Sequence, residues 1–88
     1  MNPLTFQLEI TQNLDGQPFF TTNSCAPFNF SAGDEIDGDA RRAYEDTVGN
    51  MSNGESLIVI KIRQYLFAPN GVLTARNLRI EVARRLKP

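Results

Sequence analysis

The 88-residue sequence predicts one α+β domain, residues 1–88, in which one or two helices pack on a small antiparallel sheet. Three observations support this prediction. Apolar and polar residues alternate over 4–11, apolar residues recur at helical spacing over 39–51, and β-branched residues dominate 57–66. The expected order of elements is β-β-α-β-α, or β-β-α-β-β if the last segment is a strand.

The first two elements are expected to form a β-hairpin. Strict alternation of apolar and polar residues over 4–11 is typical of a half-buried strand. Asp15-Gly16 follows, and this dipeptide between two apolar runs is a strong hairpin signal. The return strand is expected over 17–22. Pro18 has no amide hydrogen to donate, so this strand should lie at an edge of the sheet.

A helix is expected to begin at Asp39, because the apolar residues that follow are spaced by three and four positions. They are Ala40, Ala43, Tyr44, Val48 and Met51. Asp37 or Asp39 is expected to cap the helix by accepting hydrogen bonds from first-turn amides. Pairs of opposite charge four residues apart should lie along its outer face. These are Arg41 with Glu45, and Arg42 with Asp46.

The segment 57–66 predicts a central strand, buried on both faces at its start and on one face later. Strict alternation would place Ile58, Ile60 and Ile62 on one side and Leu57, Val59, Lys61 and Arg63 on the other. Residues 68–71 (APNG) predict a turn.

The last segment, 74–87, fits two structures. As a helix it would be capped by Thr74, and its apolar face would be Ala75, Leu78, Val82 and Leu86. As a strand, its apolar residues 78, 80 and 82 would alternate with charged ones, and Asn70-Gly71 would join it to the preceding strand as a hairpin. We expect the helix, because the Ala, Arg, Leu and Glu content favours that state.

The chain is expected to lie in the cytoplasm and not in a membrane. Its start lacks the basic region of a signal peptide, and its longest apolar run, 57–60, is far too short to cross a bilayer. Cys25 is the sole cysteine, so the fold cannot depend on an internal disulfide. No cation lies near Cys25 in the sequence to activate its thiol, and we expect it to be a small buried core residue.

Net charge is −1, but the charges are distributed unevenly along the chain. Residues 1–56 carry nine carboxylates and two arginines, whereas residues 57–88 carry seven basic residues and one carboxylate. Such a division can create a surface that recognises a charged partner. The simpler interpretation, which we favour here, is that the two halves neutralise each other in the folded domain.

Several chemistries are not expected. The chain has no histidine, which removes the usual general base and the commonest metal ligand. The run Asp34–Asp39 (DEIDGD) lacks the ligand spacing of an EF-hand loop. A looser divalent-cation site at Asp34, Asp37 and Asp39 is the alternative to a solvated helix start. Asp37 and Asp39 should be wet, so paired-carboxylate catalysis is not expected. We therefore predict no enzyme, no cofactor and no metal site.

The remaining prediction is a non-enzymatic protein-binding module: a regulator, an inhibitor or an assembly subunit. Its acidic surface would meet a basic partner. The partner-binding candidates are Asp34, Glu35, Asp37, Asp39, Glu45 and Asp46. Size and charge are also comparable to those of phage or mobile-element inhibitors of nucleic-acid-handling proteins. A homodimer is a further expectation, because a second copy can cover an exposed strand edge.

The alternative function is nucleic-acid binding by the basic C-terminal segment. Its candidate residues are Arg76, Arg79, Arg84, Arg85 and Lys87. In a helix, the first three of these would share part of one face and contact phosphates. No aromatic residue is interleaved among them to stack on bases, and the chain is acidic overall, so nucleic acid is the less expected partner.

Overall fold

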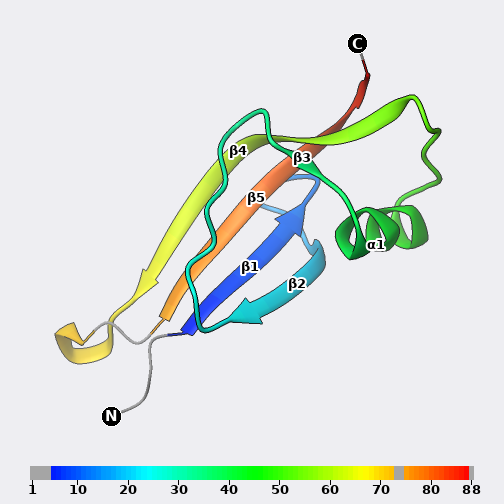
Figure 1. Cartoon of the computed structure of the whole chain (residues 1–88). Coiled ribbons are helices and arrows are strands. Elements are labelled where there is room, and N and C mark those ends of the chain that lie inside the picture. The colour runs from blue at the N-terminus through cyan, green and yellow to red at the C-terminus, as the bar shows by residue number, and fades with distance from the viewer. Residues whose placement is uncertain (1–4, 73–74, 88) are drawn as a thin grey trace.

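The computed structural model describes residues 5–72 and 75–87, and these form a mainly β domain (Figure 1). Its elements are β1 (Thr5–Thr11), β2 (Pro18–Ser24), β3 (Glu35–Ile36), α1 (Asp39–Thr47), β4 (Glu55–Phe67), a 3-10 turn (Pro69–Gly71) and β5 (Ala75–Leu86). The five strands form one mixed sheet in the order β2-β1-β5-β4-β3. The β1–β5 pair is parallel, and the other pairs are antiparallel.

The predicted α+β fold, with an antiparallel sheet and the order β-β-α-β-α or β-β-α-β-β, is wrong. The described residues contain one α-helix, an unpredicted short strand β3, and a parallel strand pair. Two hairpins, β1–β2 and β4–β5, lie side by side through β1 and β5, which run in the same direction. This is why the sheet is mixed. Leu4 of the first predicted strand and Thr74 of the predicted helix cap lie outside the described residues.

The last segment is a strand because its alternating residues fill the centre of the sheet. Ile80 pairs with Ile10 of β1 on one side and with Ile62 of β4 on the other. Ile80 and Val82 are almost fully buried. Pairing on both edges therefore outweighs the helix propensity of the segment, which is a weak preference that tertiary context commonly overrides.

The predicted hairpin is confirmed, and β2 is an edge strand, as Pro18 indicated. The turn closes by a hydrogen bond from the Gly16 amide to the Asn13 carbonyl at 2.8 Å. The hydroxyl of buried Thr11 donates across the turn to the carbonyl oxygens of Asn13 and Gln17. Pairing is irregular between Ile10 and Thr11, where Pro18 takes its place opposite Thr11.

The core lies on one face of the sheet, beneath α1 and the connector that follows β2 (Figure 1). Its buried members are Leu8, Ile10, Ile36, Ala40, Tyr44, Leu57, Val59, Ile80 and Val82. α1 packs against β2 by an edge-to-face contact between Tyr44 and Phe19, with ring centroids 5.4 Å apart. No helix in residues 5–72 and 75–87 has the length and apolarity needed to cross a membrane.

The side-chain alternation and the burial of the long strand β4 change at a bulge near its middle. The pairing with β5 is irregular between Val59 and Lys61, so one extra residue, Ile60, is inserted there. Such a bulge shifts the alternation of side chains by one position. Ile58 therefore lies opposite Ala83 on one face, and Ile62 lies opposite Ile80 on the other. The prediction that both would share a side is wrong. All six side chains of 61–66 are exposed.

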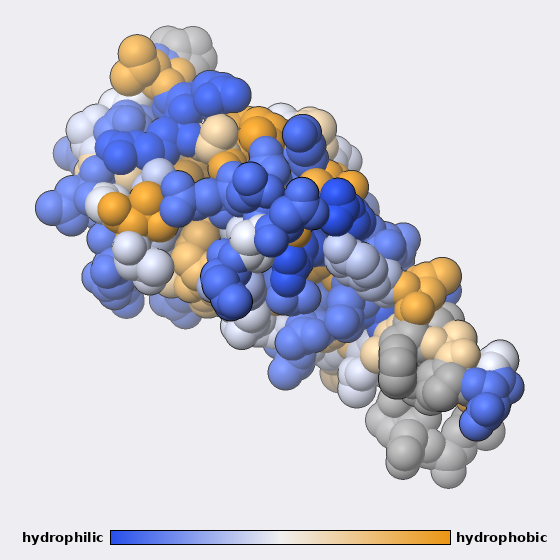
Figure 2. Space-filling model, turned by 180° about the vertical axis from the view of Figure 1, so that it is seen from behind, coloured by the Kyte–Doolittle hydropathy of each residue, from blue (hydrophilic) through white to orange (hydrophobic). Residues whose placement is uncertain are grey.

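The second face of the sheet is mostly hydrophilic (Figure 2). The β1–β2 turn folds onto it and is held by two charged residues of β5. Arg79 donates to the Leu14 carbonyl at 2.7 Å and pairs with Glu9 at 2.9 Å. The carboxylate of Glu81 accepts a hydrogen bond from the Leu14 amide at 3.0 Å. These bonds fix the hairpin to the strand beside it.

We expect Arg79→Ala to lower the free energy of unfolding by about 2–3 kcal/mol, because hydrogen bonds to a charged group at two backbone carbonyls and Glu9 are lost. The Arg79 and Glu9 side chains are only 20% and 17% exposed, so water replaces these bonds poorly. The matched control is Arg42→Ala. Arg42 pairs with Asp39 at 3.8 Å with both side chains at least 78% exposed, so its loss should cost less than about 0.5 kcal/mol. Urea unfolding of both variants measures the difference, and equal costs would contradict this account.

Candidate functional site

The start of α1 is not built as the sequence predicted. Gly38 occupies the N-cap position with φ = 68°, and no side chain caps the helix. The Asp37 carboxylate instead accepts a hydrogen bond from the adjacent Gly38 amide at 2.8 Å. The left-handed turn at Gly38 leaves Asp37 one position too early to reach the first-turn amides. Asp39 is the first helical residue, where its charge complements the helix dipole.

One of the two predicted ion pairs on α1 forms. Arg41 pairs with Glu45 at 3.5 Å, whereas Arg42 pairs with Asp39 at 3.8 Å instead of with Asp46. Arg41 has a second role, because its guanidinium donates to the carbonyl oxygens of Glu55 and Ser52 at 2.9 and 3.0 Å. These bonds attach α1 to the segment that leads into β4.

A shallow groove of about 310 Å³ lies between the start of α1 and the core face of the sheet. We call it the acidic groove. Its apolar lining, the floor, consists of half-buried Phe20 and Phe30, with the buried core residues Leu8, Ile10, Ile36 and Ala40 beneath them. Its remaining lining residues are three carboxylates, Glu35, Asp37 and Asp39. All three are exposed, so the groove offers an apolar contact surrounded by negative charge.

A second, polar depression of about 450 Å³ runs along α1. Its lining residues are Asp37, Gly38, Arg41, Arg42, Glu45, Asp46 and Asn50. Asp37 borders both depressions. Five of the six predicted partner-binding carboxylates therefore line one or both of the depressions beside this helix.

Asp34 is the exception among the predicted carboxylates. Its side chain accepts a hydrogen bond from the Ser31 amide at 2.8 Å. Its backbone carbonyl accepts one from the Val59 amide at 2.9 Å, and the neighbouring Gly33 amide donates to the Val59 carbonyl. Asp34 thus fixes the connector to β4, although its side chain is exposed.

The basic half of the chain does not neutralise the acidic groove. Among the residues that the structure describes, three ion pairs join the two halves, and each uses a carboxylate from outside 34–46. They are Arg63 with Asp15, Arg79 with Glu9, and Arg84 with Glu55. The expected neutralisation is therefore partial. Six carboxylates and only two arginines lie within 34–46, so this segment keeps an excess of negative charge.

The five basic candidates for nucleic-acid binding do not form the expected surface. Because residues alternate along β5, Arg76 and Arg84 lie on the core face while Arg79 and Arg85 lie on the opposite face. Arg79 and Arg84 are engaged in the ion pairs just described. Lys87 follows β5, and its backbone amide donates to the Gly54 carbonyl at 2.7 Å. A single helical face of arginines is thus absent from the described residues.

A charged network closes the segment between α1 and β4. Arg84 donates to both carboxylate oxygens of Glu55, at 3.0 and 2.8 Å, and to the Asn50 carbonyl at 2.9 Å. The Ser52 amide also donates to the Glu55 carboxylate. The Arg84 hydrogen bonds, then the Ser52 amide, lower the pKa of Glu55 from 4.5 to about 2.

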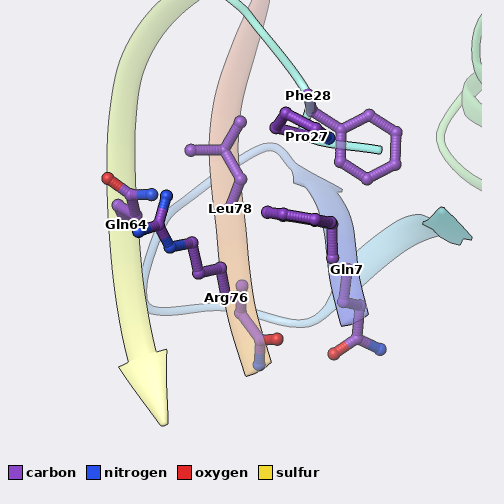
Figure 3. Close-up of a pocket in the computed structure, with 8 residues that line it drawn as sticks. Gln7, Pro27, Phe28, Gln64, Arg76 and Leu78 are labelled. Atoms are coloured by element: carbon purple, nitrogen blue, oxygen red, sulfur yellow. The ribbon is translucent and has the colours of Figure 1, made fainter. Parts of the chain in front are cut away.

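A separate cavity of about 120 Å³ lies between β1, β4, β5 and the connector (Figure 3). The Arg76 side chain extends toward Gln64 beside Leu78, and Phe28 covers the other side. Arg76 Nε is buried without a hydrogen-bond partner in the described part of the chain. Pockets for small organic ligands measure roughly 300–1,000 Å³, so this cavity is too small for an organic cofactor.

The structure also bears on two other predicted features, the burial of Cys25 and the divalent-cation site. Cys25 is exposed, so its prediction as a buried core residue is wrong. It follows the last residue of β2, at the start of a connector that runs over the surface, as loops generally do. Within the described ranges, no group of three or more His, Cys, Asp or Glu side chains is placed to hold a metal ion.

Sequence reasoning found the carboxylates of the acidic groove but not its floor. The floor residues come from β1, β2, β3, α1 and the connector, so no local spacing reveals them. The one available signal was the presence of Phe20 and Phe30 near the acidic stretch.

No protein-family model, curated protein or solved structure matches this chain.

The network at Glu55 predicts a specific dependence of stability on pH. A pKa below its unfolded value means that ionised Glu55 stabilises the fold above pH 4.5, and this contribution is lost as pH falls toward about 2. The melting temperature of the native chain should exceed that of Glu55→Gln above pH 4.5, and the difference should disappear near pH 2.

The control for this prediction is the same comparison in an Arg84→Ala background. Arg84 is the main cause of the lowered pKa, so the effect of Glu55→Gln should then depend much less on pH. Thermal unfolding followed by circular dichroism measures all four chains. A difference that persists unchanged at the lowest pH would contradict the assignment.

Proposed function

We propose that this chain is a non-enzymatic protein-binding module that holds a basic segment of a partner protein at the acidic groove. One observation carries the proposal: an apolar floor, on which Phe20 and Phe30 are partly exposed, is bordered by Glu35, Asp37 and Asp39, in a part of the chain where carboxylates outnumber arginines. Charge and shape together suit a short segment with one apolar side chain flanked by lysine or arginine.

The two parts of the acidic groove would contribute differently to binding. An apolar side chain of leucine size that leaves water contributes about 1.5–3 kcal/mol when it is fully buried. The carboxylates are exposed, so they would mainly speed the encounter and select for positive charge. Affinity would therefore come from the floor, and association rate and specificity from the rim.

A binding role accounts for the exposed carboxylates better than a catalytic one. Acid–base catalysis by a carboxylate pair needs one member to be kept protonated, usually by burial. Asp37 and Asp39 are both exposed. The same proposal places the chain in the cytoplasm as a regulator, inhibitor or assembly subunit. A role as a phage-type inhibitor of a nucleic-acid-handling protein is one form of it.

The arginine-rich strand supports nucleic-acid binding less well than the acidic groove supports protein binding. Reversing Arg79 or Arg84 would break ion pairs within the fold, so neither residue can test the alternative cleanly. Arg85 and Lys87 are exposed and lie beyond those pairs. Replacing both by glutamate is the suitable test of nucleic-acid binding, with mixed-sequence DNA and RNA as probes.

We expect Asp37→Asn to slow association with a basic partner peptide by about threefold to tenfold and to reduce its salt dependence, because steering charge is lost. The probe is a library of short peptides that carry one apolar residue between lysines and arginines. The control is Asp15→Asn, which removes an exposed carboxylate that pairs with Arg63 and does not line the groove, and it should leave association unchanged. Stopped-flow binding at two salt concentrations measures both effects.

Phe30→Ala should weaken binding of the same peptide through faster dissociation, with its salt dependence unchanged, because it removes apolar contact from the floor. A circular dichroism spectrum and a melting curve establish that the variant is folded. If neither Asp37→Asn nor Phe30→Ala alters binding while Arg85→Glu/Lys87→Glu abolishes binding to DNA or RNA, the acidic groove is not the functional site.

A further inference from the structure

The outer edge of β4 is open along most of its length. β3 pairs only with Leu57 and Ile58, and the backbone of Val59 bonds to Gly33 and Asp34. Beyond that point, residues 61–67 have no strand partner on their outer side among the residues that the structure describes. We call residues 61–67 the open edge. Unpaired amides and carbonyls along such an edge form a template for another strand.

The open edge also exposes apolar side chains. Ile62, Tyr65 and Leu66 are 38%, 41% and 62% exposed. Ile62 and Leu66 share the core face with Gln64, whereas Arg63 and Tyr65 lie on the opposite face, where Arg63 donates to the Tyr65 hydroxyl at 3.1 Å. The strand extends away from α1, which leaves this edge accessible (Figure 1).

We propose that a second copy of this chain pairs antiparallel along the open edge, with Gln64 opposite Gln64 of the second copy at a two-fold axis. Gln64 is the midpoint of 61–67, so this register uses the whole open edge. In this register each added strand also ends before it reaches Val59 of the other copy. The backbone of Val59 is already hydrogen-bonded to Gly33 and Asp34 of its own connector. The proposal does not depend on the function proposed above.

The side chains favour this register over its neighbours. In the Gln64 register, Ile62 faces Leu66 of the second copy, and Arg63 faces Tyr65 of the second copy. Apolar residues then meet each other, and each guanidinium meets an aromatic ring. An axis at Arg63 would instead place the two arginines directly opposite, which is unfavourable. An axis at Tyr65 would place Leu66 opposite Gln64.

The pairing would join two five-stranded sheets into one continuous sheet across the β4 strands. The two acidic grooves would lie away from the axis, because α1 lies on the far side of each sheet from the end of β4 (Figure 1). A two-fold pair closes on itself and uses up the edge in both copies, so it does not extend into a fibre.

Sedimentation equilibrium of the full chain at micromolar concentrations tests the pairing. The native chain should sediment with a dimer mass. Gln64→Lys places like charges opposite each other at the axis and should raise the dimer dissociation constant at least about tenfold. The matched control, Asn23→Lys, puts the same charge on the edge strand β2 at the other side of the sheet and should remain dimeric. A native chain that stays monomeric, or a Gln64→Lys variant that dimerises as tightly as the control, would overturn the proposal.

Disulfide formation tests the register. In a Cys25→Ser background, Gln64→Cys should give a cross-linked dimer with oxidised glutathione, which accepts the two electrons and two protons of the thiols. Opposed residues in an antiparallel pair have Cα atoms about 5.5 Å apart, within disulfide range. Arg63→Cys is the control, because its two copies would lie diagonally, about 7–8 Å apart. Faster cross-linking of Arg63→Cys than of Gln64→Cys would rule out the Gln64 register.

Discussion

The parallel pairing of β1 with β5 is the constraint on which the rest of this fold depends. It joins two hairpins that would each be a marginal structure in isolation. It places Ile80 beside Ile10, and both are almost fully buried at the centre of the core. α1 and the connector can cover the core face only because this pairing brings β1 and β4 into one surface. The acidic groove depends on the same pairing, because its lining residues come from β1, β2, β3, α1 and the connector, which the assembled sheet brings together.

Local sequence signals predicted the first hairpin, the helix from Asp39 and the strand at 57–66, but not β3, the C-terminal strand or the assembly of the sheet. The hairpin at Asp15-Gly16 and the helix from Asp39 were readable because each depends on residues close in the chain. The C-terminal segment was not, because alternation at Leu78, Ile80 and Val82 coexists with a composition that favours helix, and the choice was made by β1 and β4. Two-residue β3 and the bulge at Ile60 leave no periodicity to detect.

The candidate site was predictable in its charge and not in its shape. The carboxylates cluster in sequence, so their gathering around α1 follows directly. The prediction that Asp37 or Asp39 caps the helix was wrong because Gly38 takes the N-cap position with a positive φ. A glycine in the sequence permits this conformation but does not require it. Part of the opposite charge on the acidic and basic halves of the chain forms ion pairs that stabilise the fold. Arginines 63, 79 and 84 pair with carboxylates outside the 34–46 segment, and the charge of that segment persists because those pairs lie elsewhere.

The β1–β5 pairing also sets the order of events when the chain is synthesised. Glu9 and Arg79, which meet across these strands, lie 70 positions apart in the sequence. Contacts between such distant residues form slowly, because closing a long loop costs chain entropy before the contact is gained. The β1–β2 hairpin can form early, but the β4–β5 hairpin and the closed sheet must wait until β5 has left the ribosome. Until then β1 and the core face of the first hairpin stay uncovered, and such exposed apolar surface and strand edges favour aggregation.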